Sequence, residues 1–307
     1  MIKKYLQKFS ELKSKIDYLY DKHGEYDLKN PKVLMGKIIG ELHNNIQIEN
    51  IHDAEFQVFS QFGDDGIIQY LVSKLDIPNK TFIEFGVENY TESNTRYLLV
   101  NNNWSGLVID GEKKNIEFIK RDPVSFMHDL HAICAFVTRE NINDLILDFL
   151  KKGYSSEIGI LSIDIDGNDY WIWDEISVIN PVITIMEYNA VFGKDHAWTI
   201  PYKPNFSRLT GHKSFQYWGA SIKAFCRLGE KKGYSFVGCN SAGNNAYFVR
   251  NDKLGNVKTL TAEKGYVLSK FREDVDEHGE RYNIFKRIDL IKGMEIFNVE
   301  TESLEII

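Results

Sequence analysis

The sequence has few cysteines, no long apolar run and no basic tract. Its three cysteines, Cys134, Cys226 and Cys239, are odd in number, widely spaced and free of any CxxC pairing. This argues against a disulfide framework or a zinc site and fits buried thiols in a reducing compartment. No segment approaches the roughly 18 apolar residues that cross a bilayer, and the N-terminus has no apolar signal core. We therefore predict a cytoplasmic protein without membrane insertion.

The balance of charge excludes one class of partner. Lysine and arginine number 37 against 44 aspartates and glutamates, which gives a net charge of -7, and no basic run is interleaved with aromatic residues. Such a surface has no positively charged strip that could bind a phosphate backbone, so nucleic acid is not an expected partner. A length of 307 residues with 43% hydrophobic content is enough for a sizeable core, in one large domain with additions or in two small domains.

The first 50 residues carry an apolar stripe. Tyr5, Phe9, Leu12, Ile16 and Tyr20 recur at spacings of three and four residues, with lysines and glutamates between them. This spacing is typical of an amphipathic helix. The helix either packs on its own domain or pairs with a second copy to form a homodimer. We assign residues 1–54 to an N-terminal helical extension.

From about residue 55 the pattern alternates between helix and strand. Short apolar runs predict strands within residues 80–88, 105–112, 131–138, 159–166 and 181–189. Helices are predicted from Asp64 or Asp65, over 92–102 with Ser93 or Asn94 as the cap, over 140–153 and over 219–234. Strands separated by helices form a parallel sheet covered on both faces, and 235–240 with 244–250 predict a closing antiparallel hairpin. The domain spans residues 55–251, and 252–307 form a C-terminal extension.

Acidic residues follow the first two strands. The first strand ends in Glu84, Gly86 and Glu88, and the second ends in Asp110 and Gly111. An acid at the second position commonly accepts hydrogen bonds from ribose hydroxyls. A pyrophosphate is disfavoured because no further glycine follows Gly86 in the next turn. A cofactor with a ribose and no phosphate, such as S-adenosylmethionine, fits better.

The fourth and fifth strands bring more oxygen ligands. Asp164, Asp166 and Asp169 follow the fourth strand, and Glu187 and Asn189 end the fifth. Hard oxygen ligands of this kind coordinate Mg²⁺ or Mn²⁺, which would relieve the repulsion between the carboxylates. The alternative is that one carboxylate caps the helix that starts near Asp169 while another is solvated.

Several of these segments together resemble a known family. The chain is similar, from about residue 56 to 250, to the FkbM-type branch of S-adenosylmethionine-dependent methyltransferases in the stretches FSQFGDDGII, TFIEFGVENYTESNTRYLL, GLVIDG, LSIDIDGNDYWIW, YWGAS and GYSFVGCN with NAYFVR. The resemblance implies an α/β, Rossmann-like class I methyltransferase fold with a seven-stranded, mostly parallel sheet. It also implies methylation of a sugar or nucleotide-linked sugar, since such members often accompany genes for bacterial capsule or other surface polysaccharides. The cofactor contacts that we assign are Gln61, Glu84, Gly86, Glu88, Asn94, Asp110, Gly111 and Asp164.

A narrower similarity concerns a metal. The run DIDGNDYWIW resembles the motif after the fourth strand of cation-dependent O-methyltransferases, in which the first aspartate is a metal ligand. This corresponds to Asp164. Glu187 and Asn189 stand where those enzymes have an Asp-Asn pair, so the resemblance implies a divalent cation, Mg²⁺, Mn²⁺ or Fe²⁺, held by these three residues.

The predicted reaction needs a base and an acceptor site. A hydroxyl must lose its proton as it attacks the methyl group, and Asp166 and His196 are the two candidates for this base. The long segment of residues 192–219 is predicted to line the acceptor site together with the end of the fifth strand. We assign substrate contacts to Tyr188, Trp198, Tyr202, His212 and Tyr217. Asn244 and Asn245 reach the substrate or simply form a tight turn.

Two other readings remain open. Asp164 and Asp166 form an Asp-x-Asp motif, which in many glycosyltransferases holds a metal and a nucleotide-sugar diphosphate. That reading leaves Glu84, Gly86 and Asp110 unexplained. A non-catalytic module that binds a partner through residues 1–50 would have no need of acids at four strand ends.

Overall fold

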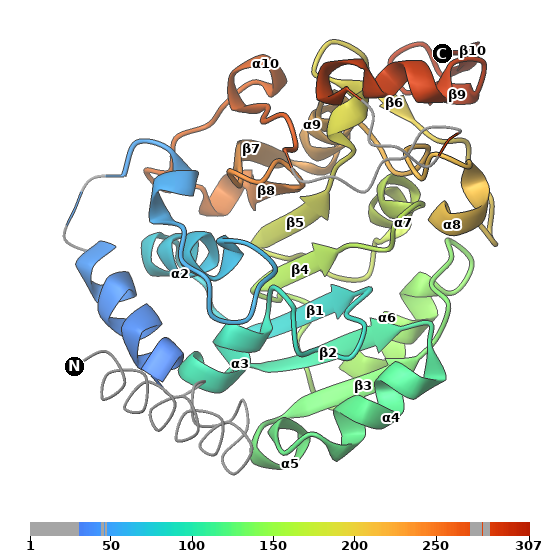
Figure 1. Cartoon of the computed structure of the whole chain (residues 1–307). Helices are drawn as coiled ribbons and strands as arrows, with labels where there is room; N and C mark the ends of the chain where they lie inside the picture. The colour runs from blue at the N-terminus through green and yellow to red at the C-terminus, as the bar shows by residue number, and fades with distance from the viewer. Residues whose placement is uncertain (1–30, 44–45, 47, 271–277, 279–282) are drawn as a thin grey trace, which may run out of the picture.

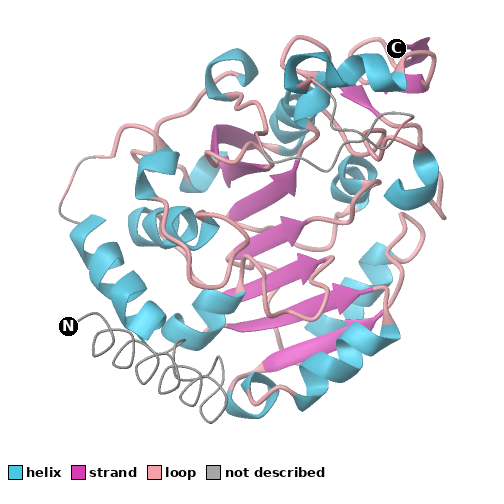
Figure 2. Cartoon of the chain, in the orientation of Figure 1, coloured by secondary structure: helices cyan, strands magenta, loops and turns pink. Residues whose placement is uncertain are grey.

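A seven-stranded sheet forms the centre of the molecule (Figures 1 and 2). The computed structural model describes residues 31–43, 46, 48–270, 278 and 283–307. The strand order is β3-β2-β1-β4-β5-β8-β7. Strands β1 to β5 pair in parallel, and β8 runs antiparallel to both β5 and β7, so β7 has the direction of the other five. Their bounds are β1 Thr81–Phe85, β2 Ser105–Asp110, β3 Leu130–Cys134, β4 Ile160–Ile163, β5 Ile183–Glu187, β7 Tyr234–Cys239 and β8 Asn245–Arg250.

Helices cover both faces of this sheet. One core joins the strands to α2 (Asp64–Lys74), α3 (Arg96–Asn102) and α4 (Lys113–Arg121). The other core joins them to α6 (Ile142–Leu150), α7 (Asp169–Glu175) and α9 (Ile222–Lys232). Successive residues of β1 alternate between the two cores, because side chains of a strand point to opposite faces. The predicted α/β architecture, a seven-stranded and mostly parallel sheet with helices on both faces and an antiparallel C-terminal hairpin, is confirmed.

Shorter elements connect this framework. The remaining α-helices are α5 (Val124–Met127), α8 (Arg208–Gly211) and α10 (Ala262–Gly265), and the 3-10 helices are η1 (Ile51–Ala54), η2 (Ala190–Phe192), η3 (Asn251–Lys253) and η4 (Ile284–Ile291). The prediction that a helix begins at Asp64 or Asp65 is confirmed by α2. The helix that was predicted to end at Gly153 is α6, and it ends earlier, at Leu150. No helix in the described ranges is long and apolar enough to cross a membrane.

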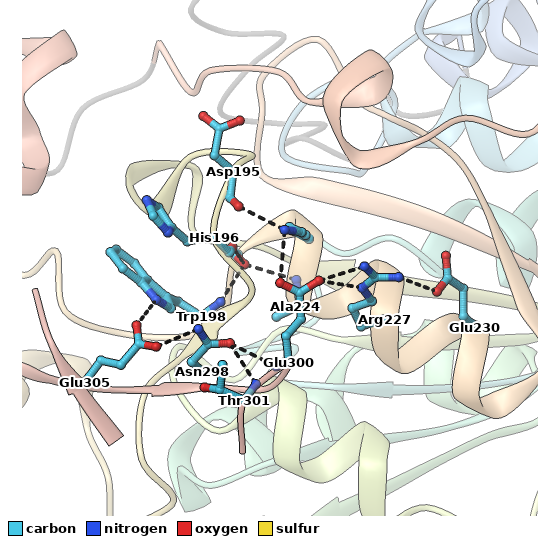
Figure 3. Close-up of polar contacts among 12 residues, drawn as sticks. Asp195, His196, Trp198, Ala224, Arg227, Glu230, Asn298, Glu300, Thr301 and Glu305 are labelled. Carbon is cyan, nitrogen blue, oxygen red and sulfur yellow. Dashed lines mark hydrogen bonds and ion pairs between the residues drawn. The ribbon is translucent and has the colours of Figure 1, made fainter. Parts of the chain in front are cut away.

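The C-terminal extension packs against the domain through a second sheet. Strands β9 (Glu295–Asn298) and β10 (Ser303–Ile306) pair antiparallel, and β9 also pairs with β6 (Trp198–Thr199) from the segment after β5. A small core between them is made of Phe192, Ile200, Tyr217, Ile291 and Ile296. Figure 3 shows the polar side of this contact, in which Glu300 accepts hydrogen bonds from Arg227 of α9. The extension therefore holds the segment after β5 in place.

The N-terminal region contains one described helix, over residues 31–43. It is the darkest blue helix of Figure 1. The predicted stripe from Tyr5 to Tyr20 lies outside the described residues.

Candidate functional site

A cavity of about 680 Å³ opens at the carboxyl ends of β1, β2, β4 and β5. In an open parallel sheet this is the edge at which ligands bind. The structure brings ten of the predicted site residues together in its wall, namely Gln61, Glu84, Gly86, Glu88, Asn94, Asp110, Gly111, Asp164, Asp166 and Glu187. These residues come from five separate segments of the chain, so only the fold assembles them.

Gly86 lies where the backbone beyond β1 comes close to the backbone beyond β4. Its φ is +72°, and its N–H donates to the carbonyl of Ile109 over 2.9 Å. A Cβ atom at this position would lie 1.5 Å from the carbonyl oxygen of Asp164. Only glycine fits here, because any side chain would overlap the neighbouring backbone and L-residues rarely adopt this φ.

Glu84 is buried, and its carboxylate is already used by the protein. It accepts hydrogen bonds from the backbone N–H groups of Asn94 (2.9 Å) and Thr95 (3.1 Å), and from the hydroxyl of Thr95. Burial raises the pKa of Glu84, and these hydrogen bonds oppose the rise. Glu84 therefore orients the segment that leads into α3, in the place of the predicted Ser93 or Asn94 cap. Asn94 itself donates to the hydroxyl of Ser162 over 3.1 Å.

Asp110 orders the turn beyond β2. One carboxylate oxygen accepts from the backbone N–H of Glu88 over 2.8 Å. The other accepts from the N–H of Glu112 (2.8 Å) and from the side chain of Asn115 (2.9 Å). A carboxylate offers about four lone-pair sites, so Asp110 retains capacity for a further donor from the cavity.

Asp164 and Glu187 form a pair of carboxyl groups at the cavity wall. Asp164 follows β4 and Glu187 ends β5, the strand that pairs with β4. Burial raises the pKa of both groups well above the usual range, and the charge of each neighbouring carboxylate raises it further. Oε2 of Glu187 is buried and has no hydrogen-bond partner within the described part of the chain. A donor on a bound molecule would satisfy this oxygen.

The other two aspartates of the motif have separate roles. Asp169 accepts from the N–H groups of Ile165 (2.8 Å) and Gly167 (2.9 Å) in the turn before α7. It is the first residue of that helix, as predicted, but the N-cap position is Asn168 and no side chain caps the helix. Asp166 lies at the cavity rim with its carboxylate 2.6 Å from Nη1 of Arg208. The guanidinium of Arg208 lies over the ring of Trp218, 4.7 Å from its centroid.

His196, predicted as a base, does not line the cavity. Its ring stacks on Trp198 with the centroids 4.1 Å apart and the planes tilted by 10°. Its carbonyl accepts from the hydroxyl of Ser221 over 2.7 Å, within the cluster drawn in Figure 3. His196 therefore lies on an exposed part of the segment away from the cavity wall, and its position does not support the predicted catalytic role.

The five predicted substrate residues also lie outside the wall of the main cavity, which corrects that prediction. Their polar atoms bind other parts of the chain: Tyr188 donates to Val267, Trp198 to Glu305, Tyr202 to Glu140 and Tyr217 to Glu295, and His212 bonds to Ser214. The segment instead contributes Phe206, Arg208 and Leu209 to the cavity. Its aromatic content predicted its involvement, but Trp198 and Tyr217 bond to the extension and Tyr202 bonds to Glu140, and none of these partners follows a recognisable sequence pattern.

Further wall residues were missed or left open by the sequence. Asn244 and Asn245 line the cavity, and the turn before them is held by Asn240, whose oxygen accepts from three consecutive backbone N–H groups. The turn is therefore confirmed, and contact of these asparagines with the substrate stays a prediction. Phe136 beyond β3 and Lys114 of α4 were missed, because neither follows a motif.

Asn189 is not free to bind a metal. Its side-chain oxygen accepts from the N–H of Val191 over 3.0 Å, and its amide nitrogen donates to the carbonyls of Gln216 and Trp218, each over 2.9 Å. These bonds fix the segment after β5. Among the residues that the structure describes, no group of three or more histidines, cysteines, aspartates or glutamates is arranged to hold a metal ion.

Comparison with known proteins finds likeness in structure alone. No protein-family model matches the sequence, and no curated protein matches it. An O-methyltransferase from Bacillus cereus in complex with SAH is 12% identical over 76% of this chain and 96% of that one, with a TM-score of 0.42. A putative O-methyltransferase from Klebsiella pneumoniae is 10% identical over 69% and 90%, with a TM-score of 0.39. A putative caffeoyl-CoA O-methyltransferase from Staphylococcus aureus is 12% identical over 71% and 99%, with a TM-score of 0.38.

Proposed function

We propose that this protein is an S-adenosylmethionine-dependent O-methyltransferase. The observation that carries the proposal is the wall of the main cavity where β1 is flanked by β2 and β4, with the Gly86 turn on one strand and Asp110 on the next. This is the switch point of the sheet, at which doubly wound folds bind nucleosides. Asp110 accepts the ribose hydroxyls, and the Gly86 turn lets the cofactor approach the backbone.

The charge of the cavity suits this cofactor. Its wall contains two basic residues, Lys114 and Arg208, against eight acids: Glu84, Glu88, Glu92, Asp110, Glu112, Asp164, Asp166 and Glu187. A sulfonium is cationic, so the surrounding carboxylates favour its binding. When bound, the cofactor supplies a methyl group that an oxygen nucleophile can displace from sulfur.

The acceptor hydroxyl lies against the Asp164–Glu187 pair. Oε2 of Glu187 accepts its hydrogen bond and orients the oxygen toward the methyl carbon. The bound cofactor would supply the methyl group to this oxygen and leave as a neutral thioether, and the carboxyl pair would take the hydroxyl proton. In this assignment the pair takes the role that the sequence suggested for His196 and Asp166.

A sugar of a bacterial surface polysaccharide, free or nucleotide-linked, is the acceptor that we propose. The resemblance of the sequence to FkbM-type enzymes supports this class. The wall on the acceptor side combines the apolar side chains Phe206 and Leu209 with Asn244 and Asn245. A sugar has the same mixed character, because it has a face of apolar C–H groups surrounded by polar hydroxyls.

The residues present do not fit the predicted divalent cation. The third expected ligand, Asn189, is occupied by Val191, Gln216 and Trp218. A cation bound by protein oxygens normally takes six or more ligands, of which the chain would supply two. No step of the proposed reaction passes through a metal.

The geometry also disfavours a glycosyltransferase. Asp164 pairs with Glu187, whereas Asp166 turns to Arg208 at the rim. The two aspartates therefore do not converge on one ligand, as a metal-bound diphosphate would need.

Calorimetric titration with S-adenosylhomocysteine, UDP and GDP tests the proposal. We expect S-adenosylhomocysteine to bind and the two nucleotides to remain unbound. Asp110→Ala should weaken its binding by about 1–3 kcal/mol, as for loss of a charged acceptor. Glu117→Ala is the matched control, because this exposed acid on α4 does not line the cavity. Binding of UDP or GDP without S-adenosylhomocysteine would overturn the proposal.

A further inference from the structure

The helix of residues 31–43 turns its small residues toward the domain and its large apolar residues outward. Gly36 is buried, and a Cβ there would lie 3.0 Å from Phe56, Val58 and Tyr97. The hydroxyl of Tyr97 donates to the carbonyl of Val33 over 3.4 Å. Exposed side chains on the helix are Leu34 (59%), Met35 (60%), Ile38 (53%) and Leu42 (59%). Packing on its own domain therefore leaves the larger apolar face unused.

These exposed residues form a ridge. Leu34, Ile38 and Leu42 are four residues apart, and Met35 lies beside them. Rows of side chains at this spacing are the ridges by which one helix packs into the grooves of another. A contiguous exposed apolar surface of this kind marks an interaction site.

The order of residue types along the ridge is the same in both directions. It is Leu-Ile-Leu about Ile38, so a two-fold axis at Ile38 pairs Leu34 of one copy with Leu42 of the other and Ile38 with itself. Such self-complementary contacts are what a two-fold dimer requires.

Charges beside the ridge agree with this arrangement. Lys37 and Glu41 are exposed on one flank of the helix, four residues apart. With the same axis and a rise of about 1.5 Å per residue, Lys37 of each copy lies about 3 Å along the helix from Glu41 of the other. An antiparallel pair thus places opposite charges together on the flank.

We propose that the protein is a homodimer in which two helices of residues 31–43 pack antiparallel about a two-fold axis at Ile38. The partner is a second copy of this chain. The dimer surface is distinct from the cavity, since no residue of this helix lines it.

Light scattering after size exclusion, with the full chain, tests the dimer. The expected mass is twice that of one chain. Ile38→Glu places two carboxylates at the axis and should raise the dissociation constant by at least about 30-fold, the loss typical of a central interface residue. The variant should keep the circular dichroism of the wild type, because Ile38 is exposed. Phe126→Glu is the matched control, since Phe126 is 81% exposed on α5, and it should remain dimeric.

Disulfide trapping provides a second measurement. In a Cys134→Ser background, Ile38→Cys should form a disulfide-linked dimer on mild oxidation, whereas Met127→Cys, 70% exposed, should not. A wild type that is monomeric would overturn the proposal, as would a dimer that Ile38→Glu leaves intact. A monomer with an Ile16→Cys to Ile38→Cys disulfide within one chain would assign the ridge to the N-terminal segment. A monomer that floats with anionic phospholipid vesicles, and loses this on Ile38→Glu, would assign it to a lipid surface.

Discussion

At the scale of single residues, the cavity depends on two residues that no other residue type could replace. Gly86 allows β1 and β4 to approach each other, and Glu84 uses its whole carboxylate to hold the start of α3. The sequence singled out both residues correctly. It assigned Glu84 to the cofactor, however, because the residues that bind its carboxylate follow it by ten and eleven positions and carry no motif.

Replacing Gly86 with alanine should damage the cavity selectively. The φ of +72° alone costs on the order of 1–3 kcal/mol for a non-glycine residue, and the overlap with Asp164 forces the strand ends apart. We expect a lower melting temperature and at least tenfold weaker binding of S-adenosylhomocysteine, measured by thermal denaturation and calorimetry. Gly153→Ala is the control, because its φ is +105° but a Cβ meets no atom within 4 Å. Equal binding by the wild type and Gly86→Ala would refute this role.

At the scale of elements, the segment before α2 is positioned by the first residues of that helix. Oδ2 of Asp65 accepts from the N–H groups of Val58 (2.7 Å), Phe59 (2.7 Å) and Ser60 (2.9 Å). The segment goes on to Gln61, which lines the cavity. The neighbouring Asp64 is buried and bonds to Asn240, Asn245 and Tyr247, so it ties the same helix to the closing hairpin.

Asp65→Ala should therefore affect both stability and the cofactor site. Loss of a buried carboxylate leaves three backbone N–H groups without their acceptor, for an expected cost of roughly 2–4 kcal/mol of unfolding free energy. Binding of S-adenosylhomocysteine should weaken as well, because the segment that carries Gln61 loses its anchor. Chemical denaturation and calorimetry measure the two effects. Asp76→Ala serves as comparison, since Asp76 is exposed and pairs only with Lys253. An Asp65→Ala protein as stable as the wild type would show that water replaces the carboxylate.

At the scale of the whole molecule, buried carboxyl groups make stability depend on pH. Burial raises the pKa of Asp65 and of Asp169 to about 6, and it raises those of Asp164 and Glu187 well above their usual values. The folded state thus binds more protons than the unfolded chain, whose carboxyls titrate near 4. The stability from these groups is complete below about pH 4 and is lost as the pH rises through the folded pKa values.

Glu187→Gln should flatten this dependence. The variant keeps the shape of the side chain and removes one carboxyl from the coupled pair, so its free energy of unfolding should fall less between pH 4 and 8, by on the order of 1 kcal/mol per pKa unit removed. Denaturant titrations at several pH values measure the slope. Glu112→Gln at the exposed rim should follow the wild type. A wild-type free energy that rises across this range would contradict the assignment.

The sequence by itself determined the fold class and the set of acids at the strand ends, because both depend on local patterns: apolar runs, their spacing, and the residue that follows each strand. The tertiary structure decided which of those acids face the cavity and which are used internally. Glu84 and Asp169 have the same charge as Glu187, yet their oxygens are taken by backbone N–H groups while Oε2 of Glu187 has none within the described residues. The C-terminal extension likewise binds the polar atoms of Tyr188, Trp198 and Tyr217, outside the cavity wall. Which side chains face the cavity depends on contacts between residues far apart in the sequence, and no short stretch of sequence reveals such contacts.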